Sequence, residues 1–417
     1  MDRVSTRAEA LLRSPIREMF DLAVQYEGVI NFGIGEPHLH TDRMIADRAY
    51  RDSLLGHTHY TANAGDPELR RALAEKLRRE NGIDADPRGE IVVTTGAMEA
   101  LYLAILCITD PGDEVLVADP GWVNYSNQIS LTGVTPVPVP VTQETGFVLQ
   151  PADLEQRCTP RTRAVILNTP ANPTGTVYSR EELDAIGVFA RSRDLMVICD
   201  EVYERLLYGD ARHHSLAANT DYSDRCITIF SFSKAYAMCG WRVGYAVGPE
   251  EIIRQMTKVH ENVSACAPSI SQRAAIHALQ DDRFTRNMLD VYSVNRKLVV
   301  ETLREIPGVT CVEPRGTFYA FPAIDLDAVA GLRAGKSVGG TAGASADAST
   351  DTAGGKAGGP HRTSRELALE ILHRERLVTV PGSAFGARGE GYLRLSFASQ
   401  TEVVEEGLQR LRRCLMG

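Results

Sequence analysis

The sequence has no excess of positive charge and no apolar run long enough to cross a bilayer. Its 417 residues hold 45 Lys and Arg against 54 Asp and Glu, and the net charge of −9 argues against a polyanion such as nucleic acid as the main partner. Residues 1–20 mix acidic with basic side chains and lack the apolar centre of a secretory signal. We therefore expect a cytoplasmic protein that binds neither nucleic acid nor membranes.

Closely spaced cysteines are also absent. The eight cysteines are scattered without a Cys-x-x-Cys pair, and several lie in apolar, strand-like runs. Free thiols explain this distribution better than metal ligands or disulfides, so we expect no bound metal.

The most informative stretch, residues 231–244, begins directly after the apolar run 227–230. It follows the pattern S-x-S-K-x(5)-G-x-R-x-G, whose candidate ligand-binding residues are Ser231, Ser233, Lys234 and Arg242. The apolar run predicts a buried strand with these residues at its carboxyl end, where open α/β sheets bind ligands. Small hydroxyls, a lysine and an arginine suit a phosphate-bearing cofactor whose aldehyde condenses with an amine, which predicts pyridoxal phosphate. A lysine and an arginine at this spacing are common on solvated surfaces, so the prediction depends on the complete pattern and its strand context.

Strand-like runs alternate with helical patterns from residue 90 onward, which predicts a mostly parallel sheet covered on both faces. The chain length suits a large and a smaller domain. We expect a large cofactor-binding domain at 46–290 and a small domain made of 1–45 and 291–417. A Gly- and Ala-rich stretch at about 328–360 cannot bury enough apolar surface to offset its ordering entropy, and we interpret it as a flexible surface insertion.

Further candidate residues follow other predicted strands. Gly96, with Ala97 and Met98, opens a helix whose free N–H groups suit a phosphate, although the loop lacks a dinucleotide fingerprint. Trp122 follows a Pro-Gly loop and could equally be an ordinary core indole. Asp200 ends an apolar strand, and a buried acid there needs a positive partner such as a protonated pyridine nitrogen.

The lysine pattern, the N-P-T-G turn at Asn172 and the R-x-S-F element at Arg394 resemble class I/II aminotransferases of fold type I. The aspartate and aromatic aminotransferase branches are the most similar, although Cys239 stands where a threonine is more usual. The resemblance spans nearly the whole chain except the insertion. It implies an α/β fold with a mostly parallel, seven-stranded sheet in the large domain and a smaller α+β domain.

The resemblance also implies a role for each candidate residue. Lys234 carries the cofactor and acts as the base, while Asp200 keeps the ring nitrogen protonated. Asn172 and Tyr203 hydrogen-bond the ring oxygen, and Trp122 stacks on the ring. The residues that hold the phosphate are Gly96, Ala97, Met98, Ser231, Ser233, Arg242 and the partner subunit's Tyr60. Substrate contacts come from Gly35, Asn172 and Arg394. A tyrosine lent by the neighbouring subunit implies a homodimer.

The implied activity is transfer of the α-amino group of an L-amino acid to a 2-oxo acid. The same residues would serve a second kind of pyridoxal phosphate enzyme, one that catalyses β-elimination, cyclisation or oxidation of an amino acid. A third hypothesis, a non-catalytic transcription regulator, is disfavoured because the short N-terminal part leaves no room for a DNA-binding domain. The sequence does not identify the amino acid, and aspartate, aromatic and alanine-type donors all stay open.

Overall fold

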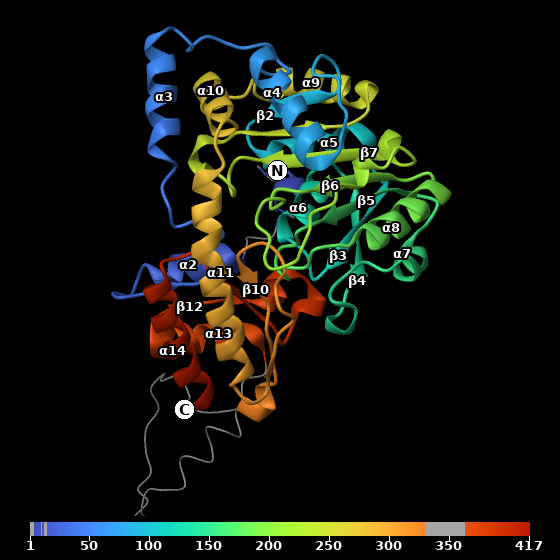
Figure 1. Ribbon diagram of the computed structural model, residues 1–417. Helices are drawn as coiled ribbons and strands as arrows, with labels where there is room; N and C mark the ends of the chain where they lie inside the picture. Colours follow the sequence, from blue (N-terminus) through green and yellow to red (C-terminus); the bar gives the residue numbers. More distant parts are fainter. Residues whose placement is uncertain (1–3, 10, 12–14, 330–362) are drawn as a thin grey trace, which may run out of the picture.

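The computed structural model describes residues 4–9, 11, 15–329 and 363–417 (Figure 1). From residue 330 onward, the expected Gly- and Ala-rich insertion lies outside the described residues. Among the described helices, none is both long enough and apolar enough to cross a membrane. All eight cysteines are free, as predicted.

A seven-stranded sheet forms the centre of the fold, with the order β2-β8-β7-β6-β5-β3-β4. Only β8 runs antiparallel to its neighbours, so the predicted, mostly parallel sheet is confirmed. The strands are β2 (Ile91–Thr94), β3 (Glu114–Asp119), β4 (Thr135–Pro140), β5 (Thr162–Asn168), β6 (Met196–Asp200), β7 (Cys226–Ser231) and β8 (Gly244–Val247).

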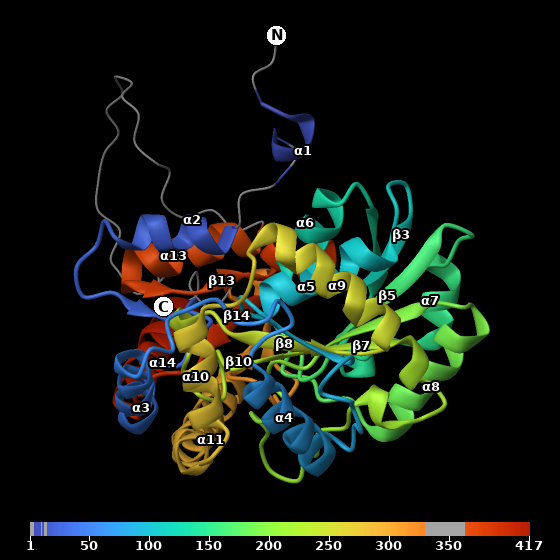
Figure 2. The same cartoon turned by 90° about the horizontal axis from the view of Figure 1, so that it is seen from above.

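Helices cover both faces of this sheet, which explains why its strands read as continuous apolar runs. Alternate strand residues pack on opposite faces, with Ile198 and Ile227 facing one layer of helices and Val197 and Cys226 facing the other. Figure 2 shows α5 and α9 on one side of β7 and β8, and α4 on the other. The helices around the sheet are α3 (Arg43–Leu54), α4 (Pro67–Lys76), α5 (Ala97–Ile108), α6 (Val123–Leu131), α7 (Pro151–Arg157), α8 (Arg180–Ser192), α9 (Glu250–Val263) and α10 (Ser269–Ala278).

A separate apolar core lies below the large sheet in Figure 1. Its strands pair as β1 (Ile30–Asn31) with β12 (Leu377–Val378), as β10 (Tyr319–Ala320) with β14 (Leu393–Ser396) and β13 (Val380–Pro381), and as β9 (Val309–Thr310) with β11 (Ala323–Ile324). Its helices are α2 (Pro15–Ala23), α11 (Arg283–Arg304), α13 (Ser364–Glu375) and α14 (Thr401–Met416). We propose that this part is the small domain of residues 1–45 and 291–417. Helix α11 runs without a break across the proposed boundary at 290.

Candidate active site

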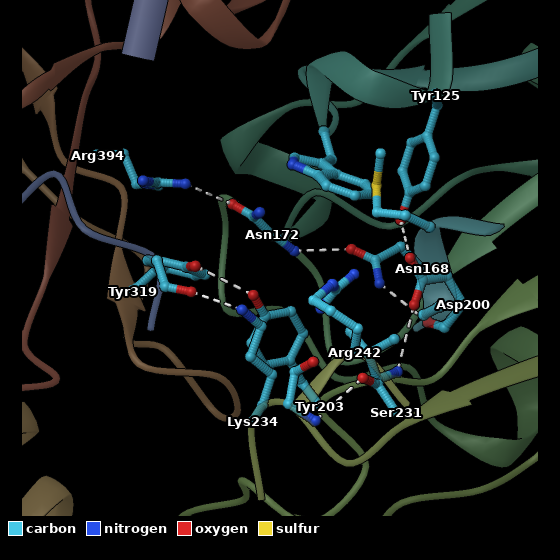
Figure 3. Close-up of a pocket in the computed structure, with 16 residues that line it drawn as sticks. Tyr125, Asn168, Asn172, Asp200, Tyr203, Ser231, Lys234, Arg242, Tyr319 and Arg394 are labelled. Carbon is cyan, nitrogen blue, oxygen red and sulfur yellow. Dashed lines mark hydrogen bonds between the residues drawn. The ribbon is translucent and has the colours of Figure 1, made fainter. Parts of the chain in front are cut away.

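A cavity of about 230 Å³ opens where β5, β6 and β7 end (Figure 3). It lies between the large sheet and the strands β10 and β14, which contribute Tyr319 and Arg394. Every predicted site residue lines it except Gly96, which precedes the lining residue Ala97, and Tyr60, whose side chain is 89% exposed. The lining residues absent from the sequence prediction are Tyr125, Asn168, Val202 and Tyr319.

Lys234 enters the cavity from the loop after β7. Its Nζ donates a hydrogen bond to the Gly35 carbonyl oxygen at 2.6 Å and lies 4.0 Å from the sulfur of Cys239. A Cβ atom on Gly35 would come within 2.6 Å of the Tyr319 hydroxyl, so glycine lets this backbone approach the cavity. The lysine amine is therefore held at the junction of the N-terminal segment and the large sheet.

Asp200 is the last residue of β6, and only 4% of it is exposed. Its carboxylate accepts hydrogen bonds from the Tyr125 hydroxyl at 2.7 Å and from the Val202 N–H at 3.2 Å. Burial raises the pKa of Asp200 to about 6, and the Tyr125 hydrogen bond opposes that rise. A buried acid on a cavity wall suits a positively charged group of a ligand.

Arg394 lies across the cavity from Asp200, and only 2% of it is exposed. Its Nη2 donates to the Gly33 carbonyl oxygen at 2.6 Å, and its Nη1 to Asn172 Oδ1 at 3.2 Å. The guanidinium carbon lies 4.3 Å from the ring centre of Tyr319, and Nε has no hydrogen-bond partner among the described residues. Burial lowers the pKa of Arg394, and the nearby Tyr319 and Tyr203 only partly oppose this. The arrangement leaves a buried positive charge available to an anion.

Tyr203 and Asn172 also line the cavity, with Tyr203 beside Lys234 and Asn172 beside Arg394 (Figure 3). The Tyr203 hydroxyl lies 3.0 Å from that of Tyr319, and the side-chain oxygen of Asn172 accepts a hydrogen bond from Arg394 Nη1 at 3.2 Å. Both side chains therefore present polar atoms that are fixed by neighbours. Trp122 lines the same cavity, in edge contact with Tyr125.

An anion cradle lies at the start of α5. Gly96 caps this helix with φ 77°, a conformation that favours glycine, and a Cβ atom there would collide with the guanidinium of Arg242. Among the described residues, the single hydrogen-bond partner of Arg242 is the Cys239 carbonyl, at 2.9 Å. The helix N-terminus, Ser231 and this arginine together suit a phosphate. With Lys234 and Asp200 nearby, the cavity fits pyridoxal phosphate.

The missed residues had weak sequence signals. Tyr125 is three residues after Trp122 in the first turn of α6, a spacing that puts both on one helix face. Asn168 ends β5, as Asp200 ends β6, so its strand-end position was a usable signal. Tyr319 looks like an ordinary core aromatic, and only the folded chain shows its hydroxyl beside Tyr203.

A family model described as "Aminotransferase class I and II" matches residues 27–411. The chain belongs to this family. An aspartate aminotransferase of Pyrococcus abyssi is 38% identical over 99% of this chain and 98% of its own. An aromatic-amino-acid aminotransferase of Thermococcus litoralis is 37% identical with the same coverage. The solved structure of Thermus thermophilus aspartate aminotransferase with maleate is 33% identical and superposes with a TM-score of 0.86, covering 99% of this chain and all of that one.

These relationships confirm the predicted fold type I and the predicted activity, amino-group transfer. The enzyme is an aminotransferase. The alternative of β-elimination, cyclisation or oxidation is not favoured, because the relatives of similar length are aminotransferases.

Proposed function

We propose that this aminotransferase binds pyridoxal phosphate through Lys234 and moves the α-amino group of an L-amino acid to a 2-oxo acid. One observation carries the proposal: the Lys234 amine, the buried Asp200 carboxylate and the buried Arg394 guanidinium, which has no carboxylate partner among the described residues, face the same cavity. These groups match an aldehyde, a protonated ring nitrogen and a substrate carboxylate, respectively.

The residues around the ring position would control its charge and orientation. When bound, pyridoxal phosphate supplies a conjugated ring that withdraws electrons from the substrate Cα. Asp200 would keep a proton on the ring nitrogen, and Asn172 and Tyr203 would hydrogen-bond the ring oxygen. Trp122 would pack against the ring and exclude water. Gly96, Ala97, Met98, Ser231, Ser233 and Arg242 would hold the phosphate.

The substrate side of the cavity would bind the α-carboxylate. Arg394 presents a planar fork that pairs bidentately with a carboxylate, Asn172 contacts it, and Gly35 lines the same cavity. The Lys234 amine, once free, would take the proton from the substrate Cα, because it is the basic amine of the cavity.

We further propose a cytoplasmic homodimer in which the partner subunit's Tyr60 reaches the phosphate. The large exposure of Tyr60 supports this, since the side chain makes little use of its own subunit. Tyr50, Leu54 and Leu55 of the preceding helix α3 and its end are also exposed, and together they form an apolar surface suited to a second subunit.

A half-reaction screen tests the proposed function. The cofactor-loaded protein is mixed with single L-amino acids, including aspartate, aromatic and alanine donors, without an acceptor. We expect the cofactor absorbance to change and about one equivalent of the matching 2-oxo acid per subunit to appear. Release of ammonia over many turnovers would contradict the proposal and favour elimination. The D-enantiomer of the best donor is the matched control.

A further inference from the structure

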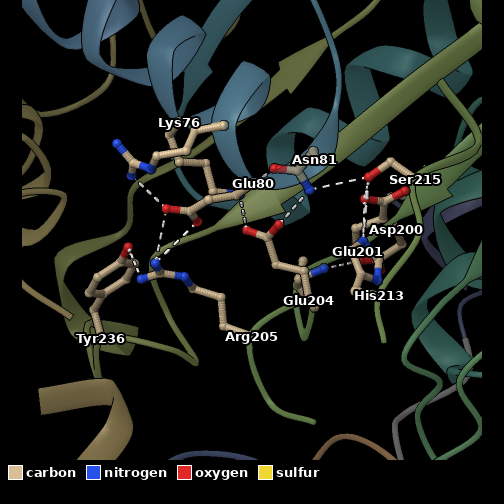
Figure 4. Close-up of polar contacts among 12 residues, drawn as sticks. Lys76, Glu80, Asn81, Asp200, Glu201, Glu204, Arg205, His213, Ser215 and Tyr236 are labelled. Carbon is tan, nitrogen blue, oxygen red and sulfur yellow. Dashed lines mark hydrogen bonds and ion pairs between the residues drawn. The ribbon is translucent and has the colours of Figure 1, made fainter. Parts of the chain in front are cut away.

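A buried polar cluster lies directly behind Asp200, outside the cavity (Figure 4). We call it the Glu201 cluster, and its members are Lys76, Asn81, Glu201, Glu204, His213 and Ser215. Asp200 lines the cavity, whereas the next residue, Glu201, turns its side chain into the cluster. Cavity and cluster residues thus alternate along this segment, since Val202 and Tyr203 also line the cavity and Glu204 belongs to the cluster.

The Glu201 carboxylate is fixed by two side chains. One of its oxygens, Oε2, lies 2.7 Å from His213 Nε2 and accepts a hydrogen bond from the Ser215 hydroxyl at 2.5 Å. Ser215 in turn accepts from the Asn81 amide at 3.2 Å. The hydrogen bonds therefore run from Glu201 to Asn81, the last residue of the π-helical turn Leu77–Asn81 that follows α4.

The two acids of the cluster, Glu204 and Glu201, differ in the groups that stabilise their charged forms. Burial raises the pKa of Glu204, but Lys76, His213 and Asn81 together outweigh burial and lower it overall. Glu201 is 0% exposed, and its second oxygen, Oε1, has no hydrogen-bond partner among the described residues. A fully buried and half-satisfied carboxylate costs folding free energy, so stability alone does not account for it.

Hydrogen bonds also hold both polar groups of the peptide unit between Asp200 and Glu201. The Glu201 N–H donates to the Ile229 carbonyl oxygen at 2.9 Å, and the Asp200 carbonyl oxygen accepts from the Asn168 amide at 2.9 Å. The direction in which the Asp200 carboxylate points therefore depends on the anchored residue that follows it.

We propose that Glu201 is a positioning residue for Asp200: its anchored side chain fixes the backbone that aims the Asp200 carboxylate at the ring nitrogen. The inference rests on the proposed function, in which Asp200 faces the cofactor ring. Glu201 itself touches neither substrate nor cofactor.

The charged groups around Asp200 and Glu201 determine whether loss of the Glu201 charge raises or lowers the pKa of Asp200. Burial is the main cause of the raised pKa of Asp200, Glu201 adds to the rise, and Tyr125, Val202 and Lys234 lower it. Removing the Glu201 charge therefore lowers the pKa of Asp200. The other titratable groups facing these two acids are Tyr203 at the cavity, and Lys76, Glu204 and His213 in the cluster.

The test compares Glu201→Gln with Ser215→Ala in the full-length protein. Pyridoxal phosphate is titrated into the cofactor-free protein between pH 5 and 8.5, and the dissociation constant is plotted against pH. In Glu201→Gln the midpoint at which affinity falls in acid should move down by about one pH unit, because a neighbouring negative charge is lost. Ser215→Ala keeps that charge but loses an anchor, so affinity should fall about three- to tenfold at every pH.

Glu204→Gln is the matched control, because it removes a charge from the same cluster at an acid that is not adjacent to Asp200 in the chain. It should lower the unfolding temperature without moving the midpoint. A wild-type midpoint for the folded Glu201→Gln protein would overturn the charge effect, and wild-type affinity for Ser215→Ala would overturn the anchoring. If Glu201→Gln does not fold, Ser215→Ala still tests the anchoring. Failure of the wild-type protein to bind the cofactor would refute the proposed function instead.

Discussion

The Tyr125 hydroxyl donates a hydrogen bond of 2.7 Å to the Asp200 carboxylate. Both side chains are buried, so this bond favours the ionised carboxylate more strongly than it would in water. It acts against burial, which raises the pKa of Asp200 to about 6. The charge on Asp200 near neutral pH is thus a balance between burial, which disfavours ionisation, and Tyr125, which favours it.

Tyr125→Phe should raise the pKa of Asp200. Losing a hydrogen bond to a charged group should raise the pKa of Asp200 by about one unit or more. The pH at which the cofactor-free protein loses affinity for pyridoxal phosphate should rise by the same amount. Tyr102→Phe, on helix α5, is the control and should leave the pH profile in place. A downward shift in Tyr125→Phe would contradict the assignment.

Asp200→Asn should stabilise the cofactor-free chain while abolishing useful turnover. A folded-state pKa of about 6 against an ordinary value of 3.8 means that the folded state binds the proton more tightly than the unfolded state. The favourable contribution of Asp200 to the free energy of unfolding is present below pH 4. It is lost as pH rises through 6, a loss of about 3 kcal/mol. Urea unfolding should therefore show Asp200→Asn gaining up to about 3 kcal/mol at pH 7.5 and about half of that at pH 5. Equal stabilities at pH 7.5 would count against a buried, destabilising carboxylate.

Arg394→Lys should weaken substrate binding far more than cofactor binding. A lysine cannot reproduce the planar fork, and losing one charged hydrogen bond reduces kcat/KM by about ten- to 150-fold, mainly through KM. Arg296→Lys is the matched control, since Arg296 is a mostly buried arginine that bonds to Pro314 and Glu313 away from the cavity. Steady-state kinetics with the best donor would distinguish them, and equal losses in both variants would argue against a carboxylate role for Arg394.

Mixed subunits test the shared site. If the partner subunit's Tyr60 completes each site, a dimer of Tyr60→Phe and Lys234→Ala subunits has one site with both lesions and one with neither. Activity should reappear when the two impaired proteins exchange subunits. Mass spectrometry should verify that the subunits have exchanged. If activity does not recover after verified exchange, or if a monomer is fully active, Tyr60 has a role within its own subunit.

The sequence predicts most of the cavity because one simple feature recurs in it. Asp200, Ser231 and Asn172 each follow an apolar run, and the ends of parallel strands meet at the same edge of a sheet. The roles of Gly35 and Arg394, in contrast, came from the family resemblance, since a glycine before a proline-containing loop and an arginine on a strand have many ordinary explanations.

What the sequence does not predict are contacts between side chains on distant segments. Tyr319 reaches Tyr203 from strand β10, 116 residues further along the chain. The Glu201 cluster joins side chains from α4 with others near residues 201–215, and the sequence gives no periodicity that pairs Lys76 with Glu204. Such contacts depend on how the layers pack, so a prediction based on local pattern cannot find them.

The most direct test of the account is to identify the lysine that carries the cofactor. The protein loaded with pyridoxal phosphate is reduced with borohydride, digested and mapped by mass spectrometry. We predict that the label lies on Lys234 alone, and that Lys234→Ala binds the cofactor without a covalent bond and does not turn over. Label on any other lysine, with Lys234 unmodified, would contradict the proposed site.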